Sequence, residues 1–165
     1  MRILVRAALL CLWLAAGAAP ARADATAFVG VTTASTARPT FGVAWGRCPS
    51  MIGFEIEFAR TIGDPTETEP SLSTVGANLI VQTTAPLHGT QFYGIGGFGA
   101  YGESIGNGRG STGLSGNIGA GAKFTLAGDL KLRVDYRLFL LKDSPDGSPV
   151  FPHRHRVSAG LSLAF

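Results

Sequence analysis

Cysteine is scarce in this chain, because among 165 residues only Cys11 and Cys48 are cysteines. Cys11 lies in the apolar N-terminal segment, so a single thiol remains if that segment is removed. A lone thiol excludes an intramolecular disulfide in an exported protein. Cys48 sits in a short turn with no histidine near it in sequence, which is more typical of an incidental thiol than of a nucleophile.

An excess of charge is also missing beyond the N-terminal segment. The whole sequence carries 14 Lys and Arg against 11 Asp and Glu, a net charge of +3. Residues 1–23 include Arg2, Arg6 and Arg22 and no acidic residue, so the remaining chain is neutral. The charge balance therefore gives no support for nucleic acid as a partner.

Long apolar runs and helical periodicity are lacking as well. The apolar segment 7–16 is short for a membrane-spanning helix and is soon followed by Pro20 and Arg22. Preceded by basic residues and followed by the small-x-small sequence at residues 21–23, it instead has the form of a secretory signal. We expect a signal peptide over residues 1–23, cleaved after residue 23 or 25, and one domain over residues 24–165; the alternative is an uncleaved anchor.

What the rest of the chain does contain is alternation of apolar and polar residues, the period of a β-strand. In the last segment Val157, Leu161, Leu163 and Phe165 alternate with Arg156, Ser158, Ser162 and other small or polar residues. The pattern predicts eight strands, at 25–33, 40–47, 51–61, 72–84, 90–103, 112–126, 130–141 and 154–165. Most of them are near the length of about 9–11 residues that a tilted strand needs to cross a bilayer.

The connections between these strands alternate in kind. Short turns are expected at 48–50, 86–89 and 127–129, and longer or more polar loops at 34–39, 63–71, 104–111 and 142–153. Short periplasmic turns and longer external loops alternate in this way in outer-membrane barrels. We therefore expect an all-β fold: an eight-stranded, antiparallel, up-and-down transmembrane barrel in the outer membrane of a Gram-negative bacterium.

The two faces of the strands predict lipid outside and a polar lumen. A soluble lipocalin-like barrel would invert these faces. Without that inversion it would have to expose apolar residues such as Leu132 and Val134 to water, or bury Lys131, Arg133, Asp135 and Arg137 around an apolar ligand. The faces are least clear in the glycine-rich first, fifth and sixth segments. In the fifth, Tyr93, Ile95 and Tyr101 share one parity and Phe92 and Phe98 the other, which predicts either a bulge or a large aromatic side chain in the lumen.

Charged residues dominate the predicted inward face. They are Glu55, Glu57, Lys123, Lys131, Arg133, Asp135, Arg137, Arg154 and Arg156. An eight-stranded barrel is only wide enough to hold side chains, and unpaired charges in so narrow a lumen would be costly. We expect an ion-pair network that fills the lumen; a binding or conducting path lined by the basic excess is the alternative.

Two segments carry a family resemblance. Residues 118–124 and 130–137, followed by a loop and a closing strand that ends in Phe165, resemble the small eight-stranded outer-membrane barrels, the OmpA-like or opacity-protein-like porin family. The resemblance implies that Leu161, Leu163 and Phe165 form the sorting signal read by the outer-membrane assembly machinery, with periplasmic chaperones as further partners. Unlike OmpA itself, this chain is expected to have no periplasmic peptidoglycan-binding domain after Phe165, so the resemblance does not imply cell-wall tethering.

Candidate sites for chemistry are weak. His153 and His155 share one strand face, but no third metal ligand is visible. A His–Ser pair of the lipid A deacylase kind is not matched, because His155 and Ser158 are predicted to face opposite sides. The glycine-rich stretch 94–99 has no following helix to hold a phosphate, and 143–148 lacks the ligand spacing of a calcium loop. We therefore expect no catalytic residue, metal or cofactor.

The sequence thus predicts an integral outer-membrane protein with a structural role, outer-membrane lipid as its surroundings, and a lumen closed by ion pairs. Two other functions stay open. One is an adhesin that binds a host or envelope partner through the external loops, and the other is a lipid A-modifying enzyme.

Overall fold

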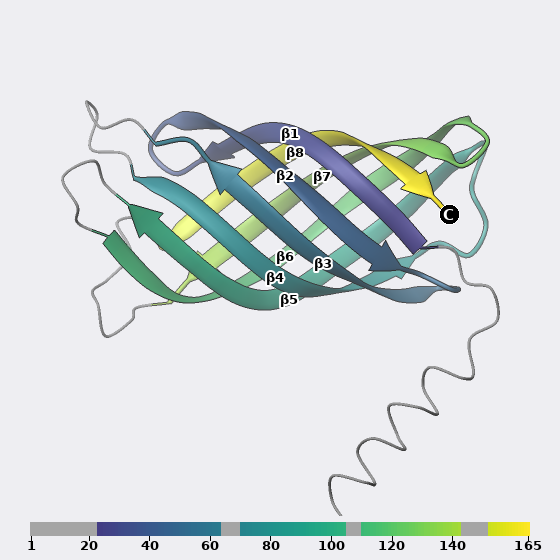
Figure 1. Ribbon diagram of the computed structural model, residues 1–165. Helices are drawn as coiled ribbons and strands as arrows, with labels where there is room; N and C mark the ends of the chain where they lie inside the picture. Colours follow the sequence, from purple (N-terminus) through teal and green to yellow (C-terminus); the bar gives the residue numbers. More distant parts are fainter. Residues whose placement is uncertain (1–22, 64–69, 105–109, 143–151) are drawn as a thin grey trace, which may run out of the picture.

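The computed structural model describes residues 23–63, 70–104, 110–142 and 152–165. In these ranges eight antiparallel strands form a closed barrel in which each strand pairs with its neighbours in sequence and β1 pairs with β8 (Figure 1). No helix in the same ranges is long and apolar enough to span a membrane. The predicted fold class, an up-and-down antiparallel barrel, is confirmed.

The strands lie close to their predicted bounds. They are β1 (Ala23–Thr33), β2 (Ala37–Arg47), β3 (Ile52–Thr61), β4 (Ser71–Gln82), β5 (Thr90–Ser104), β6 (Gly110–Ala127), β7 (Leu130–Leu141) and β8 (His153–Ala164). The largest difference is at the start of β2, which was predicted at residue 40. The sequence pattern places Pro39 in the loop 34–39, yet residues 37–39 continue the ladder with β1.

The connections fall at two opposite ends of the barrel, as predicted (Figure 1). At the short-turn end, Leu87 and Thr90 exchange backbone hydrogen bonds of 2.8 and 3.0 Å across His88 and Gly89. These two central residues have φ angles of 51° and 80°, the left-handed conformation of a two-residue hairpin turn. Within the predicted loops 63–71, 104–111 and 142–153, residues 64–69, 105–109 and 143–151 lie outside the described residues.

The seam between the first and last strands closes at the same end as the short turns. Ala23 N–H donates to the carbonyl of Phe165 at 2.8 Å, and Phe165 N–H donates to the carbonyl of Ala23 at 2.9 Å. No strand edge is therefore left open at this seam, which is the condition for a β-structure to exist in hydrocarbon.

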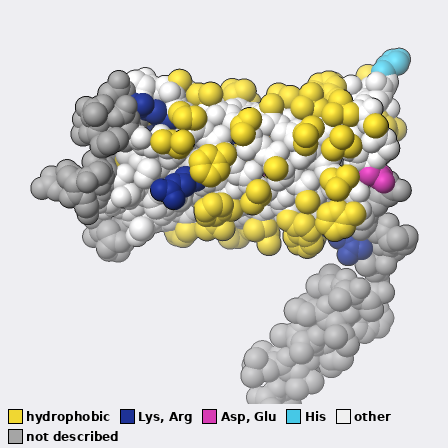
Figure 2. All heavy atoms as spheres, turned by 45° about the horizontal axis from the view of Figure 1, so that its top comes forward, with side chains coloured by type: hydrophobic (Ala, Val, Ile, Leu, Met, Phe, Trp, Pro, Cys, Tyr) yellow, Lys and Arg dark blue, Asp and Glu magenta, His cyan; other side chains and the backbone are white. Residues whose placement is uncertain are grey.

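Outside and inside have opposite polarity. Large apolar side chains point outward, among them Val29 and Phe98, which are 68% and 76% exposed, whereas the Arg137 side chain is 1% exposed inside. Figure 2 shows apolar side chains spread over the wall between the two ends of the barrel. This arrangement rules out the soluble lipocalin-like alternative, in which the apolar face would line the interior.

In β5, the structure shows which side chains face the lumen, and two of them are aromatic. Tyr93, Ile95 and Tyr101 are buried, while Phe92 and Phe98 are exposed on the outer face. The pairing of β5 with both of its neighbours runs without a shift, so the bulge alternative is wrong. A register shift occurs instead in β6, between Thr125 and Ala127.

Inward glycines make room for the lumen aromatics. A Cβ added at Gly121 would lie 2.5 Å from the Tyr93 hydroxyl oxygen, and one added at Gly42 would lie 2.3 Å from Cζ of Phe28. Both distances are too short for real contacts. A ring on one strand thus requires a glycine at the paired position of the neighbouring strand.

Candidate functional site

Most of the charged side chains in the lumen come from three strands. β3 contributes Glu55 and Glu57, and β7 contributes Arg133, Asp135 and Arg137. These residues are spaced two apart, so each group points to one face of its strand. All five are buried, and β8 adds Arg154 and Arg156 on its own inward face.

Arg133 lies at the centre of this network. Its guanidinium pairs with both carboxylate oxygens of Glu55 and, through Nε, with Oδ2 of Asp135 at 3.0 Å. The Tyr93 hydroxyl accepts a hydrogen bond from the same Nε at 2.7 Å and donates one to Asp135 Oδ2 at 3.0 Å. The guanidinium carbon also lies 4.9 Å from the centre of the Tyr93 ring, within cation–π range.

Arg137 joins the acids of two strands. Its Nη2 lies 3.0 Å from Glu55 Oε1 and 3.0 Å from Glu57 Oε2, and its Nε lies 3.1 Å from Asp135 Oδ1. One cation thereby contacts three carboxylates. Because β3 and β7 are not neighbours in the sheet, these contacts cross the lumen from one wall to the other.

Arg156 extends the network along β8. Its Nη2 lies 2.6 Å from Glu57 Oε1. Its guanidinium carbon lies 5.0 Å from the Phe28 ring centre and 4.7 Å from that of Phe139. The rings of Phe28 on β1 and Phe139 on β7 thus make cation–π contacts that help to offset the cost of burying this cation.

Smaller pairs lie outside this central group. Lys123 Nζ is 2.6 Å from Asp24 Oδ2, and Arg154 pairs with Glu103. Lys131 was predicted to share the network, but it is half-buried and takes part in none of the ion pairs found among the described residues. The structure therefore brings eight of the nine predicted inward charges into ion pairs and leaves Lys131 outside them.

Three members of the network were missed in the sequence. Asp24 precedes the predicted first strand, which begins at residue 25. Glu103 and Tyr93 lie on β5, whose faces the sequence left ambiguous. Counting in twos from Tyr101 would have placed both on its inward face.

Chemically, the network neutralises its own members. A buried carboxylate or guanidinium loses its hydration, and an opposite charge at hydrogen-bond distance offsets that loss. No group of three or more metal-ligating side chains occurs in the described ranges. At the short-turn end, partial burial raises the pKa of the Cys48 thiol, which is the opposite of what a nucleophilic cysteine requires.

Proteins of similar architecture are found among solved structures but not by sequence comparison. No family model and no curated protein sequence matches the chain. Among solved structures, the neisserial surface protein NspA superposes with a TM-score of 0.69 at 17% identity, covering 90% of this chain and 99% of NspA. The chain has the fold of the small eight-stranded outer-membrane β-barrels.

Other solved outer-membrane barrels resemble the chain to a lesser degree. The N-terminal barrel domain of OprF from Pseudomonas aeruginosa gives a TM-score of 0.65 at 12% identity, covering 87% of this chain and 97% of that domain. The outer-membrane enzyme PagL gives 0.53 at 16% identity, covering 85% of this chain and 98% of PagL. At such identities the likeness shows the fold alone.

On the outer face of the barrel, two histidines lie at the start of β8. His153 and His155 are both exposed, and Nδ1 of His155 lies 2.7 Å from the Tyr136 hydroxyl on β7. Ser158 is buried in the lumen. His155 and Ser158 therefore face opposite sides of the wall, as predicted.

The residues predicted to form the sorting signal lie on the outer face of β8 and at its end. Leu161, Leu163 and Phe165 are 51%, 53% and 66% exposed. They continue the apolar surface of the barrel toward the short-turn end. Their position suits a lipid-facing row, and their role in sorting stays a prediction.

Proposed function

We propose that this chain is an integral outer-membrane β-barrel protein with a structural role in the cell envelope, without catalytic activity, and with a lumen closed by its ion-pair network. The observation that carries the proposal is the pairing of charge across the lumen between β3 and β7. An apolar exterior and a closed sheet edge supply the other conditions for residence in a bilayer.

Closure of the lumen follows from the geometry of the central contacts. Glu55 forms ion pairs with both Arg133 and Arg137, and Arg137 also forms ion pairs with Glu57 and Asp135. A permeating ion would have to displace several of these contacts together. Each displaced contact would leave a buried charge without its partner, which costs several kcal/mol.

The lumen proposal is tested by conductance. Residues 24–165, refolded into liposomes, should show heat-modifiable gel mobility and no steady ion current in planar bilayers. A double variant, Glu55→Ser with Arg133→Ser, removes both members of a central ion pair together. We expect this variant to conduct ions. Ala120→Leu, on the outer face of β6, is the matched control. A steady current through the unchanged protein would contradict the proposal.

The enzymatic alternative is tested on the lipid itself. The likeness to PagL concerns the fold, and the opposite facing of His155 and Ser158 argues against a His–Ser pair at this position. Mass spectrometry of lipid A from cells with and without the gene should show identical acylation and phosphorylation. A change in acyl number that depends on the protein would replace the structural proposal by an enzymatic one.

A further inference from the structure

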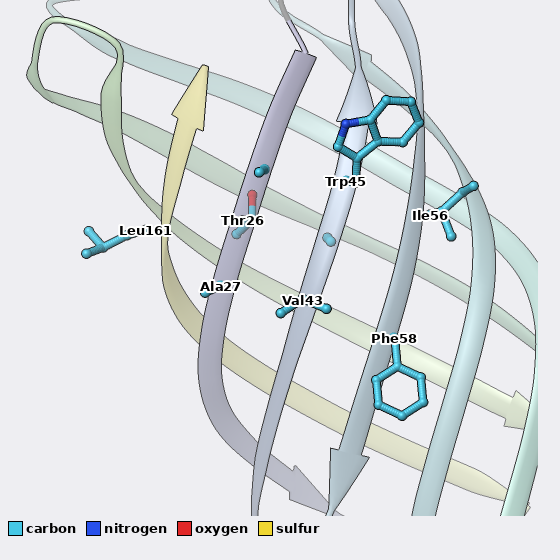
Figure 3. A pocket seen from close by; sticks show the side chains of 9 residues that line it. Thr26, Ala27, Val43, Trp45, Ile56, Phe58 and Leu161 are labelled. Carbon is cyan, nitrogen blue, oxygen red and sulfur yellow. The ribbon is translucent and has the colours of Figure 1, made fainter. Parts of the chain in front are cut away.

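The outer wall is not uniformly filled by its apolar side chains. A groove with a volume of about 580 Å³ crosses β1 and β2, within the range of about 300–1,000 Å³ typical of small-molecule pockets. Ala25, Ala27 and Val43 line its centre. Phe58 borders it on the β3 side and Leu161 on the β8 side (Figure 3).

The groove exists because small residues on β1 lie between larger residues on both neighbouring strands. Ala27 pairs with Val43 on one side and with Leu161 on the other, and Ala25 pairs with Trp45 on one side. Alternation sends all of these side chains outward. The long side chains therefore form walls, and the alanines form a floor set below them.

Polar groups lie at one end of the groove and just beyond it. Trp45 lines it and has an indole N–H, a hydrogen-bond donor. Arg47 follows on the same face of β2, two residues or about 7 Å nearer the short turns. It pairs in register with Ala23 and Phe54, at the rim of the barrel. Toward the short turns, the apolar lining is thus followed by an aromatic donor and then by a cation at the end of the barrel.

From this order of groups we infer that the groove is a binding site for one anionic phospholipid. An acyl chain would lie over Ala25 and Ala27, and the phosphate headgroup would meet Arg47 and the Trp45 indole. Tryptophan is enriched at this level of the bilayer, and arginine suits phosphate oxygens because its donors are arranged as a fork. The inference rests on the proposed insertion of the barrel in the outer membrane, and it commits to a lipid rather than to a second copy of the chain.

Trp45 makes the site directly measurable, since the other tryptophan of the chain, Trp13, belongs to the predicted signal peptide. Residues 24–165 would be inserted into vesicles that contain phospholipids with brominated acyl chains, which quench nearby tryptophan fluorescence. Mixtures of brominated phosphatidylglycerol with ordinary phosphatidylcholine, and the reverse, give the relative affinity for the two lipids. We expect phosphatidylglycerol to be favoured about two- to fivefold, the effect of one partly exposed charge pair.

Variants separate the headgroup from the acyl chain. Arg47→Gln should abolish the preference for phosphatidylglycerol, while Arg60→Gln, an exposed cation near the other end of β3, should leave it unchanged. Ala27→Leu should fill the groove and reduce quenching by both brominated lipids, while Ala120→Leu on β6 should not.

Three results would overturn the inference. They are equal quenching by the two lipids, a preference that survives Arg47→Gln, and cross-linking between copies through Ala27→Cys in a Cys48→Ser background. If the protein fails to insert into vesicles at all, the proposed function itself fails, so the two failures are distinguishable.

Discussion

The Tyr93 hydroxyl donates a hydrogen bond to Oδ2 of Asp135 at 3.0 Å, although β5 and β7 are separated by β6. The same oxygen of Asp135 accepts from Nε of Arg133 at 3.0 Å. The Tyr93 side chain thus extends from β5 past β6 and reaches the charged residues on the inner face of β7. Gly121, which pairs with Tyr93 on the neighbouring strand β6, leaves the space that the ring needs.

The first prediction concerns that glycine. In Gly121→Ala the added methyl group would meet the Tyr93 hydroxyl at 2.5 Å and the Val134 carbonyl at 2.6 Å. Because the second of these contacts is backbone, relief requires the wall to shift, and we expect a loss of about 1–3 kcal/mol in unfolding free energy. Urea unfolding of vesicle-refolded protein measures it.

Gly94→Ala is the control for that substitution. Its added methyl group would have no neighbour closer than 4.0 Å, so its stability should match that of the unchanged barrel. Equal losses in the two variants would show that the Tyr93 contact is not what requires glycine at residue 121.

The second prediction concerns coupling in the lumen. Arg133→Gln and Glu55→Gln each leave buried charges short of a partner, which typically costs about 3–5 kcal/mol. The double variant should lose less than the two single losses added together, by about 0.5–3 kcal/mol. As a control, Arg133→Gln combined with Glu103→Gln should be additive, because Glu103 pairs with Arg154. Additivity in the first cycle would contradict a direct interaction.

The third prediction concerns the lipid-facing side of β7. Val134 is exposed between the buried residues Arg133 and Asp135. Val134→Arg should cost about 2–4 kcal/mol, because it places a cation in hydrocarbon near the bilayer midplane. Val134→Ala serves as the control for the loss of the side chain. Urea unfolding in vesicles distinguishes them, and a harmless Val134→Arg would show that this face does not meet lipid.

The fourth prediction concerns orientation. Thr36 lies in the β1–β2 connection and Ser50 in the β2–β3 turn, at opposite ends of the barrel, and both are exposed. In a Cys48→Ser background, Thr36→Cys should react with an impermeant maleimide on whole cells. Ser50→Cys should react only after the outer membrane is permeabilised. The reverse labelling pattern would place the short turns outside.

The fifth prediction concerns sorting by the terminal aromatic. Phe165→Ala keeps the two backbone hydrogen bonds to Ala23 and removes a ring that is 66% exposed. The loss of stability in refolded protein should stay below the value of about 1.5–3 kcal/mol for a fully buried aromatic side chain. Assembly in cells should nevertheless fall sharply if the ring is the recognised signal. Quantifying the protein in outer-membrane fractions tests this, with Phe98→Ala on β5 as control. Unchanged outer-membrane levels of Phe165→Ala would show that the ring is not the signal.

Much of the barrel can be derived from the sequence, because the side of the sheet to which a side chain points depends only on its position along its own strand. A strand sends successive side chains to opposite sides, so the alternation in β7 and β8 alone distinguishes Arg133 from Val134 and Arg156 from Val157. The same period, interrupted by Gly128 and the Pro86–Gly89 turn, marks where strands end. The faces of the first, fifth and sixth strands could not be derived in this way, because their glycines and small residues do not distinguish an apolar from a polar face.

Which charges meet is decided by the tertiary structure. Glu55 and Arg133 are 78 residues apart and on strands that do not pair, so their contact depends on barrel diameter, strand tilt and the accumulated register of the intervening strands. The pairing of Asp24 with Lys123, like the groove over Ala27, depends on those same quantities. The sequence by itself determined the faces and the turns, since each follows from a few consecutive residues. Only closure of the barrel decided the partners, since it sets the distance between walls.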